Sequence, residues 1–270
     1  MRAFDLVRQW PAPNVAVAVI DNNDKLHVHG DTSIVFHLTS ISKVMTAWAT
    51  LIAVEDGSVS LEDQVGQDGC TLRHLLSHAG GYGFSKSDAL ISPQRKRVYS
   101  NSGYYMIAQH VAVATQFEYA DFLREAVFSP LAMTSAYLDG SAAKDVYCNI
   151  DDMATFLAEM KRPTLIARDT FLDATSSQYP DLSGVVPGFG YFNPCSWGLG
   201  PELRSGKAPH WTATRNSTST YGHFGGSGTF AWVDPVGNVA CCVLTDLAFD
   251  VWARDAWPAF GDAVLEELGR

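Results

Sequence analysis

Ser40 and Lys43 stand three residues apart where a helical pattern begins, and this pair could carry nucleophilic chemistry. Residues three apart on a helix lie on one face, so the hydroxyl and the amine would be neighbours. A buried lysine loses its proton more readily, and backbone N–H groups at a helix start can stabilise an oxyanion. The pair therefore predicts a serine that is acylated, although a capping serine and a solvated lysine would give the same tetrapeptide.

A helix is expected to hold this pair, beginning near Thr39 and ending near Gly57. Thr39 could serve as its N-cap, and glycine is a residue type that commonly follows a helix end. Between them, apolar side chains recur with helical spacing, which predicts a helix buried over a wide face. These side chains are Val44, Met45, Trp48, Leu51 and Ile52.

Strand patterns lie near both ends of the chain. Residues 14–20 and 25–29 predict an antiparallel hairpin, and residues 228–233 and 238–245 predict a second one. A short strand over 34–38 should lead into the first helix. Hairpins at both ends predict an antiparallel sheet to which both termini contribute, flanked by helices, in an α/β fold of the α+β type.

The segment between the hairpins is predicted to be a mostly helical insertion. Helical patterns cover residues 71–81, 98–114, 122–128 and 151–160, and another follows residue 250, where Pro258 should start a new helix or cause a kink. We expect a single domain over residues 1–270, with a sheet lobe from about 1–45 and 200–270 and a helical lobe over about 46–200.

Residues 168–221 break these periodic patterns. Glycine, proline and aromatic residues dominate the segment. A long irregular stretch in a compact domain is typically functional, so this segment either walls a pocket or packs as loops over the core.

The composition is that of an ordinary globular protein, with 270 residues of which 47% are hydrophobic and 18% charged. A net charge of −10 without a long basic run argues against nucleic-acid binding. No run of about 18 apolar residues predicts a membrane span, and the first residues lack the apolar core of a signal peptide. We therefore expect a cytoplasmic protein whose five cysteines are free, buried thiols.

Two pairs of histidines have spacings that metal ligands can have. His27 and His29 are two apart on a predicted strand, and His74 and His78 are four apart on a predicted helix. The spacing of the first pair is also that of two polar side chains on a solvent-exposed strand face. The second pair lacks the intervening glutamate of helical zinc sites. We expect no metal and no cofactor.

Three motifs, in order along the chain, resemble those of serine β-lactamases and penicillin-binding proteins. Ser40–Lys43 resembles the Ser-x-x-Lys motif, Tyr99–Asn101 resembles the Tyr-x-Asn motif of the class C branch, and His223–Gly225 resembles the third motif. That third motif is Lys-Thr-Gly in β-lactamases and often His-x-Gly in related esterases and peptidases. Connecting segments are similar as well, at Leu72–Gly81, Pro130–Met133, Trp197–Gly200 and Val243–Asp246. The resemblance spans nearly the whole chain and implies the β-lactamase/transpeptidase-like fold.

The resemblance implies a division of catalytic roles. Ser40 would be the nucleophile that forms an acyl-enzyme, and Lys43 and Tyr99 would share the proton transfers. Which of these two is the base stays open. The backbone N–H groups of Ser40 and Gly226 would form the oxyanion hole.

The resemblance also implies residues that bind substrate. Asn101 would hydrogen-bond Lys43 and a substrate carbonyl, and His223, in place of the family's lysine, would tune the tyrosine or hold substrate. Gly225 and Gly226 suit a strand edge that a ligand approaches closely.

Three departures from the family pattern bear on the substrate. The chain is short, it carries His223 instead of the lysine that binds the β-lactam carboxylate, and it shows no secretion signal. Together they favour a serine hydrolase for a small ester or amide. The alternatives are a D-amino-acid peptidase, carboxypeptidase or weak β-lactamase and, from another class, a catalytically silent ligand-binding protein. A small-molecule ester, amide or β-lactam is thus the expected partner, and the oligomeric state stays open.

Overall fold

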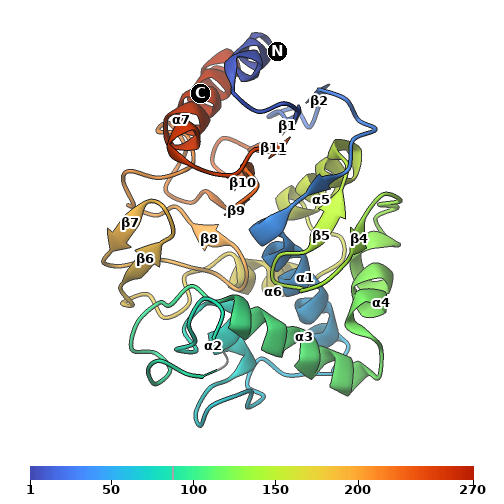
Figure 1. Ribbon diagram of the computed structural model, residues 1–270, viewed down its shortest axis with the longest axis vertical. Coiled ribbons are helices and arrows are strands. Elements are labelled where there is room, and N and C mark those ends of the chain that lie inside the picture. Colours follow the sequence, from blue (N-terminus) through green and yellow to red (C-terminus); the bar gives the residue numbers. More distant parts are fainter. Residues whose placement is uncertain (87) are drawn as a thin grey trace.

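The computed structural model describes residues 1–86 and 88–270 (Figure 1). Its main sheet has six strands in the order β2-β1-β11-β10-β9-β8. The strands are β1 (Val15–Ile20), β2 (Leu26–His29), β8 (Glu202–Leu203), β9 (Tyr221–Gly225), β10 (Thr229–Asp234) and β11 (Val239–Thr245). The two terminal hairpins join because β1 pairs antiparallel with β11, with Val15 opposite Thr245. The predicted antiparallel sheet to which both termini contribute is confirmed.

Helices and short strands complete the described part of the chain. The helices are α1 (Ser42–Glu55), α2 (Leu72–Leu76), α3 (Asn101–Thr115), α4 (Tyr119–Leu123), α5 (Ile150–Lys161), α6 (Arg168–Ala174) and α7 (Val251–Glu267). One small sheet contains β3 (Phe36–His37), β5 (Val146–Cys148) and β4 (Tyr137–Leu138), and another pairs β6 (Gly184–Val186) with β7 (Gly190–Phe192). None of the helices in the described ranges is both long and apolar enough to cross a membrane.

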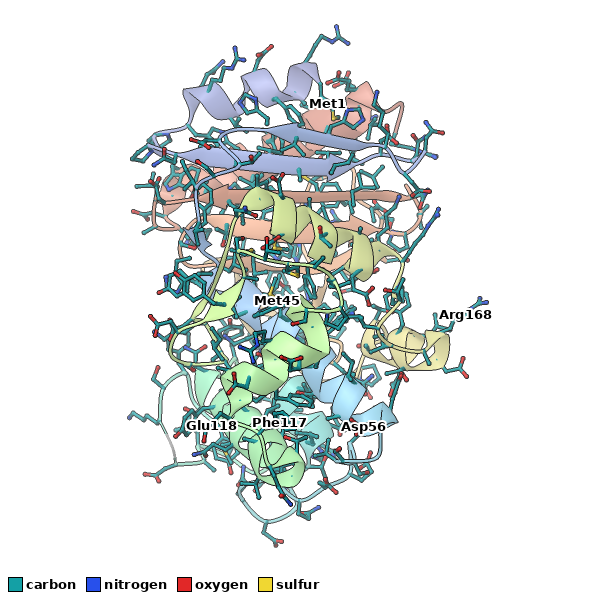
Figure 2. All side chains as sticks on the ribbon, turned by 90° about the vertical axis from the view of Figure 1, so that its right-hand side faces the viewer. Met1, Met45, Asp56, Phe117, Glu118 and Arg168 are labelled. Atoms are coloured by element: carbon teal, nitrogen blue, oxygen red, sulfur yellow. The ribbon has the colours of Figure 1, made fainter. Side chains whose placement is uncertain are left out.

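Two hydrophobic cores lie on the two faces of the main sheet, because side chains alternate along each strand. On β1, Ala16 and Ala18 join the core shared with α1, α3 and α5, whereas Val17 and Val19 join the core beneath α7. Figure 2 shows this layering, with the strands between the C-terminal helix and α5 and with Met45 of α1 in the next layer. The two ends of the chain meet on the α7 side, where Glu267 accepts hydrogen bonds from the first backbone N–H groups.

All five cysteines are buried, and none forms a disulfide, as the sequence predicted. The neighbours Cys241 and Cys242 point to opposite faces of β11 and belong to different cores.

Several predicted elements differ from the observed ones. Thr39 is not a helix cap: Thr39–Ile41 forms a 3₁₀ turn, and α1 begins only at Ser42. The end near Gly57 is confirmed, since Gly57 has a φ of +79° immediately after the C-cap of α1. The predicted helix over 71–81 is limited to the five residues of α2.

One further prediction of a helix boundary was wrong. The helix predicted over 122–128 is split into α4 and a π-helical segment at Arg124–Phe128. Of the two outcomes predicted for Pro258, the start of a new helix does not occur, because the residue lies inside helix α7, and a kink there stays a prediction. Burial of Trp257 and Phe260 beneath the sheet outweighs the backbone hydrogen bond that the proline cannot make.

Candidate active site

Ser40 lies in the 3₁₀ turn between β3 and α1, and this turn is packed against the end of β9. A Cβ atom at Gly225 would collide with Thr39 Oγ1 and with the Leu38 carbonyl, so only glycine allows the approach. Thr39 itself has a φ of +46°, a left-handed conformation that is strained for a β-branched residue. Ser227 Oγ donates to the His37 carbonyl at 2.6 Å and ties the two segments together.

Lys43 is completely buried one turn after Ser40, as the spacing predicted. Its Nζ lies 3.3 Å from Ser40 Oγ, 2.6 Å from Asn101 Oδ1 and 2.8 Å from the Ala143 carbonyl oxygen. Burial lowers the pKa of Lys43 well below its usual range, and the positive charge of Lys144 acts in the same direction. The two carbonyl oxygens can only accept hydrogen bonds, so a neutral Lys43 amine donates its two N–H groups to them. Its lone pair is then directed to the Ser40 hydroxyl.

Tyr99 precedes α3 and contacts both members of this pair. It lines the same cavity as Ser40, and Lys43 Nζ lies 4.8 Å from the centre of its ring. Burial raises the pKa of Tyr99 far above its usual range, with the nearby Ser40 hydroxyl opposing this shift. The phenol therefore keeps its proton at neutral pH, whereas the lysine amine loses its own readily.

His78 holds Tyr99 from behind, a position that the sequence analysis missed. The two ring centres are 4.6 Å apart, and His78 Nδ1 accepts the Ser100 N–H at 3.2 Å. His74 lies in a separate environment, where Nδ1 accepts the Thr71 N–H at 2.9 Å. The two histidines thus have different structural partners. Within residues 1–86 and 88–270 there is no group of three or more His, Cys, Asp or Glu side chains placed to bind a metal ion.

His223 lies on β9 across the site from Lys43. Its Nδ1 is 2.7 Å from the Phe224 carbonyl oxygen, and its Nε2 is buried and has no partner among the described residues. Burial lowers the pKa of His223 to about 4, so the imidazole is neutral at pH 7. The ring centres of Tyr99 and Trp197 lie 5.8 and 5.7 Å from that of His223.

A cavity of about 170 Å³ opens beside Ser40 and is mostly apolar. The irregular segment predicted as either pocket wall or packed loops forms part of its wall. A Cβ at Gly226 would meet no atom within 4 Å, so the backbone there is accessible. The lining residues are Ser40, Phe84, Tyr99, Pro187, Gly188, Trp197, His223, Phe224, Gly226 and Phe249.

Two larger hollows lie near the site. One, of about 470 Å³, shares Gly226 with the cavity and is also lined by Thr39 and Asp246. The other, of about 480 Å³, is lined by Asn101, which contacts Lys43, and by Ser102 and Lys144. They leave room for the parts of a substrate that do not fit beside Ser40.

A buried polar cluster supports the wall behind Trp197, and the sequence analysis missed it. Glu202 on β8 lies 2.9 Å from Lys207 Nζ and 3.1 Å from His210 Nε2, and it accepts the Trp211 indole N–H at 2.6 Å. Lys207 also donates to the Ser196 carbonyl at 2.8 Å, next to Trp197. The cluster therefore fixes β8 and Trp197 relative to β9.

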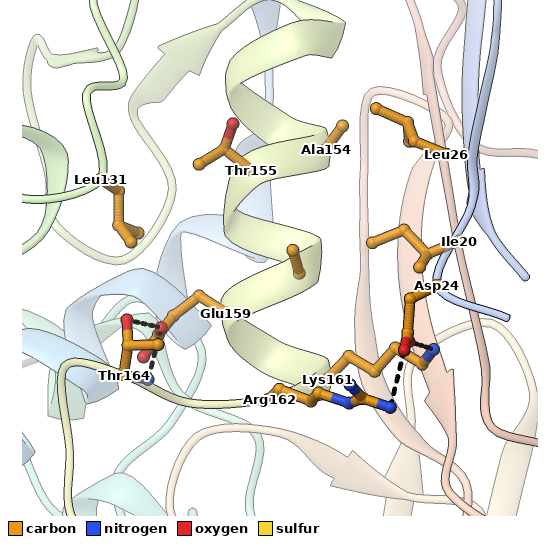
Figure 3. Close-up of a pocket in the computed structure, with 11 residues that line it drawn as sticks. Ile20, Asp24, Leu26, Leu131, Ala154, Thr155, Glu159, Lys161, Arg162 and Thr164 are labelled. Carbon is orange, nitrogen blue, oxygen red and sulfur yellow. Dashed lines mark hydrogen bonds and ion pairs between the residues drawn. The ribbon is translucent and has the colours of Figure 1, made fainter. Parts of the chain in front are cut away.

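Another hollow of about 480 Å³ lies far from Ser40, between α5 and the β1–β2 hairpin (Figure 3). Its charged groups bind one another: Asp24 lies 2.6 Å from Lys161 and 2.7 Å from Arg162. Glu159 accepts from the Thr164 N–H and hydroxyl. These pairings are structural, so the chemistry of the described residues is concentrated at Ser40.

The geometry brings together the residues that the family resemblance singled out. Lys43 hydrogen-bonds Ser40 and Asn101, and Tyr99 lines the cavity beside Ser40. His223 and Gly226 share the cavity wall with Ser40, and Gly225 sets the approach of β9 to the nucleophile turn.

Comparisons with known proteins agree with this fold. The chain is similar to a β-lactamase from Mycobacterium bovis, with 43% identity, 98% of this chain and 99% of that chain covered, and a TM-score of 0.96. Unliganded simvastatin synthase from Aspergillus terreus has a TM-score of 0.80 at 16% identity, with 98% and 97% covered, which shows the fold alone. The octameric penicillin-binding protein homologue from Pyrococcus abyssi also shows the fold alone. Its TM-score is 0.76 at 17% identity, with 99% of this chain and 76% of that chain covered.

Among curated proteins, penicillin-binding protein 4* of Bacillus subtilis (strain 168) is 28% identical over 135 residues. That match covers 38% of this chain and only 30% of the relative. The model of the beta-lactamase family matches residues 4–264, nearly the full sequence. This chain therefore belongs to the beta-lactamase family of serine hydrolases, which also includes penicillin-binding proteins.

Proposed function

We propose that this protein is a hydrolase that acts through an acyl-enzyme on Ser40, and that its substrate is a small ester or amide. The single observation that carries the proposal is the environment of Lys43. Its amine is buried beside Ser40 and Asn101 and bound only to neutral oxygen atoms. Burial lowers the pKa of such an amine and so favours its neutral form, which can remove the proton of Ser40.

Acylation begins with this proton transfer. Lys43 Nζ takes the hydroxyl proton while Ser40 Oγ forms a bond to the substrate carbonyl carbon, whose oxygen becomes an oxyanion. The backbone N–H groups of Ser40 and Gly226 stabilise that oxyanion. Their position in the wall of one cavity supports this assignment.

The leaving group departs with a proton from Tyr99. The tyrosine holds its proton at neutral pH and lines the cavity beside Ser40, so it can donate to the leaving oxygen or nitrogen. The Lys43 ammonium then returns a proton to Tyr99. In deacylation a water molecule gives a proton to the neutral Lys43 and attacks the acyl carbon. The bond to Ser40 Oγ then breaks, the acid is released, and the Lys43 ammonium returns the proton to Ser40 Oγ.

The substrate class follows from the cavity. Its volume of about 170 Å³ and the aromatic walls at Phe84 and Phe249 favour a short apolar group beside the scissile bond. Asn101 lines the neighbouring hollow and is placed to contact a substrate carbonyl there. His223 is uncharged and gives a carboxylate no cationic anchor.

A second candidate function is β-lactamase activity. The observation that favours it is the 43% identity with the M. bovis protein, which is described as a β-lactamase. A peptidase acting on D-amino acids is compatible with the same Ser40 chemistry. A silent ligand-binding role is disfavoured, because it would not require the hydrogen bonds among Ser40, Lys43 and Asn101.

The test is reaction with a fluorophosphonate probe followed by intact-mass and peptide analysis. We expect one adduct, on the peptide that contains Ser40, and none in Ser40→Ala. An adduct on another serine, with Ser40 unmodified, would refute the assignment. Steady-state rates on short-chain aryl esters, D-amino-acid amides and nitrocefin then rank the substrates, and a nitrocefin kcat/KM above that of every ester would make the second candidate the better one.

A further inference from the structure

Tyr99 lies in a segment, residues 98–100, that belongs to no helix or strand. It therefore lacks the regular backbone hydrogen bonds that hold Lys43 in α1 and His223 in β9. A general acid has to come within about 3 Å of the atom that it protonates, so a tyrosine on such a segment needs other contacts to fix its ring. His78 supplies contacts on both sides of it.

His78 binds the backbone before and after Tyr99. Its carbonyl oxygen accepts the Val98 N–H at 2.9 Å, and its Nδ1 accepts the Ser100 N–H at 3.2 Å. The imidazole lies against the phenol, with 4.6 Å between the two ring centres. One residue thus contacts the residue before Tyr99, the residue after it and the side chain between them.

The position of His78 is in turn fixed by the end of α2. Its N–H donates to the Leu75 carbonyl at 3.2 Å, and its backbone has a φ of +57°, a left-handed conformation of the kind that ends a helix. The side chain is buried, with its ring centre 5.3 Å from that of Tyr104 and 4.9 Å from that of Trp197. His78 therefore provides a fixed support for Tyr99.

The Nδ1 acceptor is the feature that requires a histidine at this position. Because the Ser100 N–H donates to Nδ1, the proton of the neutral ring is on Nε2. Nε2 is buried and has no hydrogen-bond partner among the described residues. A phenylalanine would fill the same space without the cost of that unpaired N–H. Burial lowers the pKa of His78 well below its usual range, so Nδ1 remains an acceptor at neutral pH.

We propose that His78 is a positioning residue for Tyr99: by accepting the Ser100 N–H at Nδ1 it holds the phenol where it can protonate the leaving group, so that its loss selectively slows substrates whose leaving group needs a proton. This inference rests on the proposed function, in which Tyr99 gives its proton to the leaving oxygen as the bond between that oxygen and the carbonyl carbon breaks. An alkoxide leaves far less readily than a nitrophenolate. Alkyl esters therefore depend on Tyr99 more than nitrophenyl esters do.

The test compares ethyl butanoate with 4-nitrophenyl butanoate, which form the same acyl-enzyme. In His78→Phe, which removes the acceptor and keeps a ring, kcat/KM should fall about 100-fold on the ethyl ester and about tenfold or less on the nitrophenyl ester. The nitrophenyl-to-ethyl ratio of kcat/KM should thus rise by at least about tenfold. This parameter reports acylation, the step in which the leaving group departs.

Three further variants separate positioning from a loss of structure. His78→Asn keeps an acceptor close to the place of Nδ1 and tolerates a left-handed backbone, so the ratio should return most of the way to the wild-type value. His78→Gly also allows this backbone but has no acceptor. It should raise the ratio as His78→Phe does, and it replaces that variant if the phenylalanine prevents folding. Adding His78→Phe to Tyr99→Phe should leave the ratio unchanged, because no phenol is left to position.

His74→Phe is the matched control. His74 is also buried on α2, and its Nδ1 accepts the Thr71 N–H at 2.9 Å, but its ring lies against Tyr179 instead of Tyr99. This variant should melt at a lower temperature than wild type, while its nitrophenyl-to-ethyl ratio stays at the wild-type value.

Three results would overturn the inference: an unchanged ratio in a folded variant that lacks the acceptor, a His78→Asn ratio as high as that of His78→Phe, or an equal rise in His74→Phe. These failures differ from failure of the proposed function. If the fluorophosphonate probe labels Ser40 in wild type but the ratio does not respond as expected, the positioning role of His78 is wrong. If Ser40 is not labelled, the acyl-enzyme itself is wrong.

Discussion

Two buried lysines in the described part of the chain have contrasting surroundings, Lys43 beside the nucleophile and Lys207 behind the cavity wall. Lys43 is bound to a hydroxyl and to two neutral carbonyl-type oxygens, whereas Lys207 lies 2.9 Å from the carboxylate of Glu202. Burial disfavours the charged form of Lys43, and no anion bonded to it compensates. Burial also opposes ionisation of Glu202, but Lys207 and His210 hold the pKa of Glu202 well below its usual range.

The difference teaches that burial alone does not make a lysine a base. A buried ion pair keeps its charges, and its loss exposes an uncompensated partner. A buried amine with neutral partners is available for proton transfer instead. Four predictions test this contrast, beginning with the largest expected effect.

Lys43→Met should abolish most turnover while the protein stays folded. We expect kcat on the best ester to fall by at least about 10³-fold, because a general base contributes about 10²–10⁴ and no other neutral amine contacts Ser40 in the described structure. The unfolding free energy should not fall, and near neutral pH it should rise, because folding of the wild type removes a proton from an amine whose unfolded pKa is near 10.5. Steady-state kinetics and urea unfolding measure both. Full activity in this variant would eliminate Lys43 as the base.

Lys43 and Tyr99 should act as one proton-transfer unit. Lys43→Ala and Tyr99→Phe should each lower kcat by several orders of magnitude, and the double mutant should be little worse than the worse single mutant. The reason is that both proton positions belong to one coupled system, in which the amine takes the proton that the phenol later receives. The measurement is kcat/KM for wild type and the three variants on one ester. Losses that simply multiply would mean that the two residues act independently.

Lys207→Met should show the reverse pattern. It leaves Glu202 buried without its main partner, so the unfolding free energy should fall by about 3–5 kcal/mol. Folded molecules should keep kcat within about tenfold, because Lys207 does not line the cavity. Lys207→Met combined with Glu202→Gln should recover part of the loss, since no charge is left unpaired. If the two lysine variants lose stability equally, the proposed contrast between them is incorrect.

The smallest expected effect is in the pH dependence of stability. An unfolded lysine titrates near 10.5, and the folded pKa of Lys43 is well below that value. Between the two pKa values the unfolded state binds one more proton, so the unfolding free energy should rise with pH by up to about 1.4 kcal/mol per unit. Lys43→Met should lack this contribution. The difference between the two proteins isolates it above about pH 8, where His78 and His223, whose pKa values Lys43 helps to lower, are neutral in the folded and unfolded states.

The sequence predicted those parts of the site that depend on local spacing or on the family resemblance. The contact between Ser40 and Lys43 follows from helical periodicity, and the two hairpins follow from strand alternation and turn residues. That Tyr99 and His223 lie beside this pair could be expected only from the resemblance, because no local pattern relates residues so far apart.

Other features depend on contacts that no local pattern reports. The ion pair of Glu202 and Lys207 lies in an irregular stretch, and its burial is decided by how that stretch folds over β9. The left-handed conformation of Thr39 is imposed by the close approach of β9 at Gly225. His78 was considered only as a metal ligand, since its contact with Tyr99 requires two loops to meet.

The adjacent thiols of Cys241 and Cys242 provide separate reporters for the two halves of the molecule. Each is fully buried, one in the core beneath α7 and one in the core shared with α1 and α5. A thiol reagent can reach each sulfur only when its own side of the sheet opens, so labelling rates under native conditions measure the opening free energy of each core. Variants that keep a single one of these two cysteines would then tell whether α1 and the terminal helix α7 detach from the sheet together or independently.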